Sequence, residues 1–322
     1  MACENARLDD SARISNNNSA NWFNLCFSAC ADYGSYQVGV AQFLHERYDV
    51  VQSPHILLSG CSSGALVATS LLLGAQQGPL DTALQFGQFY AAHHRFAHLD
   101  LLSLLQQFVV ELLQRLYPDA EAEQVICTTL NERLFVQVTT NISKAQGTLL
   151  HGCWQSLAQF ANDLASSSYI PGVTGSLFTS DCLRLKWKDG GFSDNTPRLQ
   201  LDGSNSFVWA KSLANPFFHS PPAAAAELAD HSGSASSSGS GCGDKVVPNI
   251  VISQYSWRTR TRVEFIEGFF VRLGKEHVMK LAEEGYKDAY QHRDEWTAIP
   301  GLVRRSEVLT HPMTVNWNDF IR

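Results

Sequence analysis

Apolar and polar positions along the chain alternate in patterns that predict strands and helices in turn. Residues 21–27 predict a first strand, and the amphipathic spacing of residues 36–46 predicts a helix. A second strand is expected over residues 55–59, and an apolar helix over residues 65–73, ended by Gly74. Strands that alternate with helices indicate a parallel sheet covered on both faces.

The same periodicities continue through the rest of the chain, and two segments depart from them. They predict strands over residues 134–140, 183–188 and 250–254, and helices within residues 80–117, 156–167 and 269–291. Residues 1–20 are expected to form a flexible polar arm. Residues 221–244, rich in Ala, Ser and Gly, are expected to be a disordered insertion in one domain that spans residues 21–322.

A charge-free run surrounds the most informative motif. Between Asp49 and Asp81 the chain carries no acidic or basic side chain except His55, and Gly-Cys-Ser62-Ser-Gly lies in the middle at residues 60–64. An apolar strand, a tight glycine turn and an apolar helix are the setting of a nucleophile elbow. An ordinary Gly/Ser turn in a buried strand–helix unit explains the pentapeptide equally well.

The elbow interpretation gives each residue of the motif a physical role. Gly60 and Gly64 allow a strained turn and a close approach between strand and helix. Ser62 then lies at the helix N-terminus, where the dipole stabilises negative charge. The apolar flanks are interrupted by Gly, Pro and Gln, so we interpret the run as buried core instead of a membrane span.

Composition limits the class of partner and compartment. The net charge of −7 and a charged content of 17% provide no basic face for nucleic acid. The eight cysteines show no C-x-x-C pairing, and the first residues carry no apolar signal core. Reduced thiols in the cytoplasm are therefore the expectation.

A second glycine-rich turn follows the predicted strand at residues 183–188. It consists of Asp189, Gly190 and Gly191. A Ser–His–Asp hydrolase normally places several strands before its nucleophile, whereas only one strand precedes the elbow strand here. A Ser62–Asp189 pair accordingly fits better than a triad. A Ser–His–Asp esterase remains an alternative.

Several blocks together resemble the patatin-like phospholipase family, in particular its adiponutrin-type branch. Residues 27–39 occupy the place of the family's glycine-rich loop, and residues 60–64 match its G-x-S-x-G elbow. Residues 165–171 resemble its A-S-x-x-x-P-type segment, and residues 187–197 match its D-G-G-x-x-D-N-x-P block. Residues 282–288 are similar to its late G-Y-x-D helix.

The resemblance implies a fold, a reaction and a substrate class. It implies a three-layer α/β/α sandwich with a mostly parallel central sheet. Ser62 is then the nucleophile and Asp189 the base of a lipid acyl hydrolase that needs no cofactor or metal. The implied substrates are phospholipids or acylglycerols, met in the cytosol or peripherally at a membrane or lipid-droplet surface. Transfer of the acyl group to another lipid is an allowed variant.

The resemblance also assigns an oxyanion hole, and here the chain departs from the family. The backbone N–H groups of the loop belong to Ala29, Cys30, Ala31 and Asp32, where the family has several glycines. Alanine does not adopt positive φ as readily as glycine, and Asp32 adds negative charge. A weakened or inactive protein that binds lipid or serves as a scaffold is therefore the alternative function.

Three histidines form the remaining candidate for chemistry. His94 and His98 have the i, i+4 spacing of a zinc pair, with His93 beside them. No third ligand or glutamate base is apparent, so we expect a solvated helix face and no metal.

Overall fold

The computed structural model describes most of the regular elements of the chain. The described residues are 22–30, 34–73, 78–93, 101–117, 121–140, 147–175, 187–192, 196, 199–201, 207–209, 245–252 and 275–306. The expected N-terminal arm and the expected insertion at 221–244 both lie outside these residues and stay predictions.

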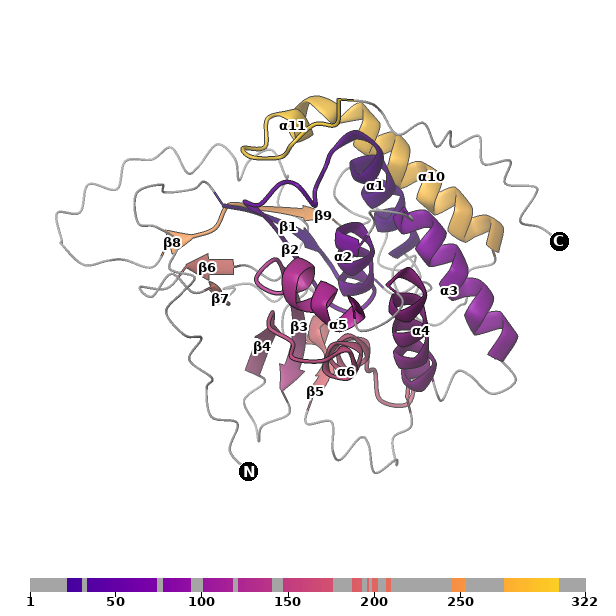
Figure 1. Ribbon diagram of the computed structural model, residues 1–322. Coiled ribbons are helices and arrows are strands. Elements are labelled where there is room, and N and C mark those ends of the chain that lie inside the picture. Colours follow the sequence, from indigo (N-terminus) through magenta and orange to yellow (C-terminus); the bar gives the residue numbers. More distant parts are fainter. Residues whose placement is uncertain are drawn as a thin grey trace, which may run out of the picture.

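A six-stranded sheet forms the centre of the molecule (Figure 1). In spatial order its strands are β4 (Gly147–His151), β3 (Leu134–Thr140), β2 (Ile56–Gly60), β1 (Phe23–Phe27) and β9 (Asn249–Ile252), with β5 (Trp187–Asp189) also paired to β3. Strands β3, β2, β1 and β9 are parallel, whereas β4 and β5 are antiparallel to β3. The sheet is thus mostly parallel, as expected.

The central strands are buried on both faces, which explains why most of their residues are apolar. In β2, Ile56 and Leu58 belong to the main core, whereas Leu57 points to a smaller cluster on the other face. In β3, Leu134 makes contacts in the main core and Phe135 in the smaller cluster. This alternation follows from the two-residue period of a strand.

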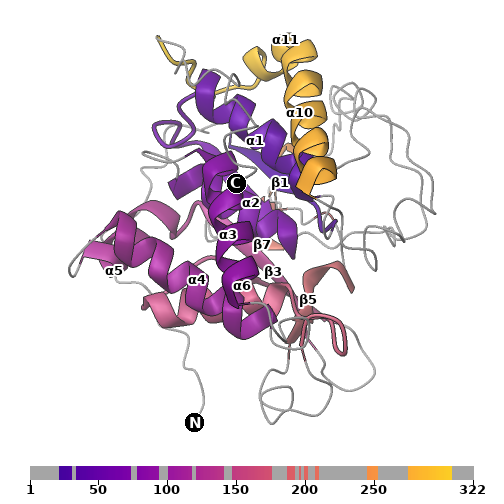
Figure 2. The same ribbon diagram turned by 90° about the vertical axis from the view of Figure 1, so that its right-hand side faces the viewer.

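Helices cover the face of the sheet that carries the main core. They are α1 (Gly34–Arg47), α2 (Ser63–Leu73), α3 (Pro79–His93), α4 (Leu101–Leu116), α5 (Glu121–Val125), α6 (Leu157–Ser167), α10 (Lys275–Gln291) and α11 (Arg293–Thr297), with a π-helical turn at Ile126–Leu130. Figures 1 and 2 show α1, α2, α3, α4 and α10 grouped on one side of the central strands. The parallel connections between β1, β2 and β3 run through this layer.

Helices α1 and α10 touch through glycines, although they are more than 200 residues apart in sequence. A Cβ added at Gly39 would lie 1.8 Å from the Ala282 carbonyl oxygen, and one added at Gly285 would lie 1.9 Å from the Tyr36 carbonyl oxygen. The Tyr36 hydroxyl donates to Asp288 Oδ2 at 2.9 Å in the same buried interface. The late helix therefore holds α1, whose first turn adjoins the predicted oxyanion loop.

Strands cover the described part of the other face. A three-stranded antiparallel sheet contains β7 (Phe207–Trp209), β6 (Leu199–Leu201) and β8 (Lys245–Val246). Leu199 and Val247 pack against Leu57 and Phe135 of the central sheet. The chain is an α/β sandwich with a mostly parallel central sheet, as predicted. The described layer on the second face consists of strands, so the second helical layer of the expected three-layer α/β/α arrangement is not seen among the described residues.

The sequence predicted most of the helices and strands, and the elements that it missed are short. Strand β3 and helix α6 have the predicted extents, and Ser156 caps α6 by accepting from the Gln159 amide. Strands β4, β6, β7 and β8 and helices α5 and α11 were not predicted. The structure describes only the end of the strand expected at 183–188. In the described part of the chain, no helix is long and apolar enough to cross a membrane.

Candidate active site

Ser62 lies in a strained turn between β2 and α2. Its φ of 54° is in the left-handed region, which side chains other than glycine rarely adopt. A Cβ at Gly64 would come within 2.2 Å of the Phe27 carbonyl oxygen, and one at Gly60 within 2.7 Å of the Ala65 nitrogen. Only glycine allows β1, β2 and α2 to approach so closely. Strain of this kind gathers at functional sites, and the turn has the shape expected of an elbow.

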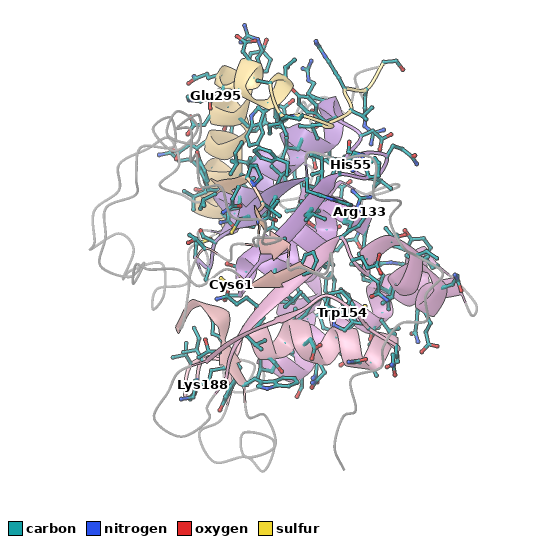
Figure 3. The ribbon with its side chains drawn as sticks, turned by 90° about the vertical axis from the view of Figure 1, so that its left-hand side faces the viewer. His55, Cys61, Arg133, Trp154, Lys188 and Glu295 are labelled. Atoms are coloured by element: carbon teal, nitrogen blue, oxygen red, sulfur yellow. The ribbon has the colours of Figure 1, made fainter. Side chains whose placement is uncertain are left out.

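Asp189 reaches Ser62 because β2 and β5 share one edge of β3. Strand β4 occupies the other edge, opposite residues 136–140. On the shared edge, Gly60 of β2 lies opposite Val136, and Asp189 of β5 lies opposite Val138. β2 ends at the elbow. β5, which is antiparallel to β3, pairs with the residues of β3 that follow along the same edge. In Figure 3, Cys61 marks the elbow and Lys188 marks β5.

The turn after Asp189 is held by polar side chains of β3. The Gln137 side chain donates to the Gly190 carbonyl at 2.9 Å. The Thr139 hydroxyl donates to the Asp189 carbonyl at 2.8 Å. Gly190 also lies against the buried Cys61, which packs between the elbow and this turn. These contacts keep the carboxylate of Asp189 beside the elbow.

The Asp189 carboxyl is buried, and its electrostatics suit a base. Burial raises the pKa of Asp189 to about 7, and hydrogen bonding with the Ser62 hydroxyl and the Gly191 amide opposes this rise. The Gly191 amide donates to Oδ1 at 2.8 Å. Oδ2 has no partner of normal hydrogen-bond geometry among the described residues. The Ser62 hydroxyl is therefore close to the carboxylate but does not form a regular hydrogen bond with it.

The structure brings together only part of the predicted oxyanion loop. Ala29 and Cys30 are buried at the end of β1. The Cys30 amide donates to the Ser63 hydroxyl at 3.3 Å, and the Cys30 thiol lies 3.6 Å from the same oxygen. Ala31 and Asp32 lie outside the described residues, so their part in the loop stays a prediction.

The described residues offer no candidate metal centre. No group of three or more His, Cys, Asp or Glu side chains that can hold a metal ion occurs among the described residues. His93 ends α3, whereas His94 and His98 lie outside the description. Within the described residues, no histidine forms a hydrogen bond with Ser62 or Asp189.

One residue that contacts the elbow was missed by sequence reasoning. The Ser62 amide donates to the Ser167 hydroxyl at 2.9 Å, at the end of α6. Ser167 lies in the segment 165–171 that resembles a family block, but the sequence contains no signal that assigns it a partner.

The comparison with family models settles the relationship. The model described as patatin-like phospholipase matches residues 25–202, more than half of the chain. The chain belongs to the patatin-like phospholipase family. The match includes the elbow, the segment 165–171 and the Asp189 turn. Membership supports a lipid hydrolase in general, but it does not identify the substrate or the reacting residues.

Two curated relatives each match a little more than half of this chain. The human patatin-like phospholipase domain-containing protein 2 is 27% identical over 187 residues, which cover 56% of this chain and 34% of that protein. The mouse 1-acylglycerol-3-phosphate O-acyltransferase Pnpla3 is 28% identical over 182 residues, which cover 55% of this chain and 41% of that protein. The chain thus spans well under half of the length of these two relatives.

Among solved structures, the ExoU–SpcU complex from the type III secretion system of Pseudomonas aeruginosa shows a weak likeness. The TM-score is 0.41 at 12% identity, over 86% of this chain and 52% of that chain. This likeness is too weak to assign a role to any residue.

Proposed function

We propose that the chain is a lipid acyl hydrolase in which Ser62 is the nucleophile and Asp189 the general base. The observation that carries the proposal is the pairing itself. A serine in a strained elbow lies beside a buried carboxyl whose pKa is raised to about 7. Two segments more than 120 residues apart meet there, and both belong to the region that the family model matches.

The chemistry follows from the properties of the two side chains. A serine hydroxyl is a weak nucleophile until a neighbouring base takes its proton. A carboxylate with a pKa near neutrality is a stronger base than an exposed one, because burial disfavours its charge. Ser62 Oγ attacks the ester carbonyl carbon while its proton passes to Asp189. The tetrahedral intermediate then collapses, the leaving alcohol takes a proton, and water hydrolyses the acyl-enzyme.

The oxyanion of that intermediate needs nearby donors. The amides of Ala29 and Cys30 lie at the end of β1, next to the N-terminus of α2, whose dipole favours negative charge. We assign the predicted residues Ala31 and Asp32 to the same loop as part of this proposal.

The substrate class is proposed from the family and its named members. Phospholipids or acylglycerols fit the family description, and one relative is named as an acyltransferase that acts on 1-acylglycerol-3-phosphate. Transfer of the acyl group from Ser62 to a lipid alcohol is then the natural variant of hydrolysis. A cytosolic protein that works at a membrane or lipid-droplet surface is the setting that this proposal implies.

One observation favours a second function, that of a catalytically silent lipid-binding or scaffold protein. The Cys30 amide, a predicted oxyanion donor, is engaged by the Ser63 hydroxyl. A missing donor lowers the rate by about 10²–10³. The enzyme proposal requires this amide to turn to the substrate during the reaction.

Labelling by a fluorophosphonate probe separates the two functions. Under the enzyme proposal, wild type is labelled, whereas Ser62→Ala is not and Asp189→Asn is labelled far more slowly. Ser70→Ala is the matched control, because Ser70 is a buried serine of α2 whose hydroxyl donates to the Val67 carbonyl. Folded wild type that resists labelling and releases no fatty acid from phospholipid or triacylglycerol emulsions would contradict the enzyme proposal. Substituting each histidine in turn is expected to leave labelling intact, which distinguishes a dyad from a triad.

A further inference from the structure

The last residue of α6 and the residues after it contact both halves of the Ser62–Asp189 pair. The Ser167 hydroxyl accepts a hydrogen bond from the Ser62 amide at 2.9 Å. Two residues later, the Tyr169 carbonyl accepts from the Asp189 amide at 2.8 Å. A single short segment therefore holds the backbone of the nucleophile and the backbone of the base.

The hydroxyl of Ser167 is directed by a second hydrogen bond. It is buried and donates to the Gln137 carbonyl of β3 at 2.7 Å. Because its proton is used there, its lone pairs face the elbow and accept from Ser62. The Gln137 side chain donates in turn to the Gly190 carbonyl at 2.9 Å. The elbow, β3 and the turn after Asp189 thus belong to one hydrogen-bond network.

The neighbouring serines have other roles, which makes Ser167 distinctive. The Ser166 hydroxyl donates to the Asn162 carbonyl within α6. The Ser168 hydroxyl is buried without a hydrogen-bond partner among the described residues. Of these three consecutive serines, Ser167 is the one whose side chain joins α6 to the elbow.

The left-handed conformation of Ser62 explains why such a contact matters. A residue with a side chain adopts φ near 54° only when its surroundings over-determine it. The Ser167 hydroxyl fixes the direction of the Ser62 amide and with it the orientation of the Cα–Cβ bond. Catalytic pairs are sensitive to this orientation, since a misplacement of about 1 Å can lower the rate about 10²-fold.

We propose that Ser167 is a positioning residue that sets the aim of the Ser62 hydroxyl toward Asp189, an inference that rests on the proposed function. It acts through the backbone of Ser62 and does not touch the substrate. Its loss lowers the rate of attack and leaves substrate binding in place.

The test compares Ser167→Ala with Ser166→Ala, a buried serine one position away whose hydroxyl donates within α6. We expect kcat and the rate of fluorophosphonate labelling to fall about 10- to 100-fold in Ser167→Ala, with KM within about twofold of wild type. Ser166→Ala is expected to keep the wild-type kcat. A general loss of folding would instead lower the labelled fraction without slowing its rate. Equal labelling rates for Ser167→Ala and wild type overturn the proposal.

A second measurement keeps the proposal testable without activity. Amide hydrogen exchange followed by mass spectrometry on the intact chain reports the elbow directly. Ser167→Ala is expected to speed exchange in peptides that contain residue 62, and Ser166→Ala is not. If wild type resists labelling, the proposed function fails on its own. The positioning role is then judged by exchange, and unchanged exchange at the elbow overturns it.

Discussion

Gly190, the residue after the candidate base, lies directly against Cys61, the residue before the candidate nucleophile. A Cβ added at Gly190 would come within 2.7 Å of the Cys61 Cβ and within 2.4 Å of the Gln137 carbonyl oxygen. The two glycine-rich motifs of the sequence are therefore in contact through a position that has no room for a side chain.

This contact predicts the effect of adding a single methyl group at Gly190. Gly190→Ala must shift the Asp189 turn relative to β3 and the elbow, because the added Cβ would clash with the Gln137 backbone as well as with Cys61. We expect the fluorophosphonate labelling rate to fall at least about 10²-fold, as for other misplaced catalytic groups. Labelling kinetics and a melting curve check this. A folded Gly190→Ala protein that is labelled at the wild-type rate would refute the assigned arrangement.

Ser63 is expected to restrain the oxyanion loop. Its hydroxyl accepts from the Cys30 amide at 3.3 Å, a long and therefore weak hydrogen bond. Ser63→Ala removes the competing acceptor, so the amide becomes available to the developing oxyanion. We expect the labelling rate to rise by about two- to tenfold, measured against Ser70→Ala as the control. A fall of similar size would mean that Ser63 itself supplies a donor or orders the loop.

The raised pKa of Asp189 predicts how activity depends on pH. The general base must be ionised to accept the proton from Ser62, and burial places the pKa of Asp189 at about 7. The value of kcat/KM should fall about tenfold per pH unit below 7 and level off above about 8. Initial rates in buffers of constant ionic strength from pH 5 to 9 measure this. A profile that is flat between pH 5 and 8 would exclude Asp189 as the titrating base.

The same shift predicts that Asp189 lowers the stability of the fold at neutral pH. Its pKa is about 7 when folded, against an ordinary value of 3.8. The unfolded chain therefore releases a proton between pH 4 and 7 while the folded chain retains it. The contribution of Asp189 to the free energy of unfolding is therefore most favourable below pH 4, and this advantage is lost as the pH rises through 7.

Asp189→Asn isolates this effect, because the amide is neutral at every pH. Relative to wild type, we expect Asp189→Asn to gain a few kcal/mol in the free energy of unfolding at pH 8, of which little remains at pH 4. Urea unfolding of both proteins at the two pH values measures the difference. An equal difference at pH 4 and pH 8 would show that burial of the charge is not its cause.

The glycine contact between α1 and α10 predicts opposite effects for two similar substitutions. Gly39→Ala places a Cβ against the Ala282 carbonyl and is expected to destabilise the fold by at least about 2 kcal/mol. Gly87→Ala is the control, since Gly87 lies in helix α3 with nothing within 4 Å of its added Cβ. Gly87→Ala is expected to stabilise by about 0.5–1 kcal/mol. Urea unfolding that shows equal effects would contradict the close helix packing.

Local pattern was sufficient for the elbow and for most long elements. The strand, the glycine turn and the helix around Ser62 are neighbours in sequence, so their apolar periodicity and the two glycines predict the turn without any distant contact. Helix α6 and strand β3 were predicted for the same reason. Strand β4 was missed because Gly147–His151 is short and gains its strand conformation from pairing with β3.

By itself, the sequence determined which residues are reactive candidates, the family they belong to and the alternation of strands and helices. Only the tertiary structure decided how those residues meet. The shared edge of β3 brings Asp189 to the elbow, Ser167 holds the Ser62 amide, and Ser63 engages the Cys30 amide. These contacts join segments that lie 30 to more than 120 residues apart. Their geometry depends on strand order and burial, which no local pattern of residues encodes.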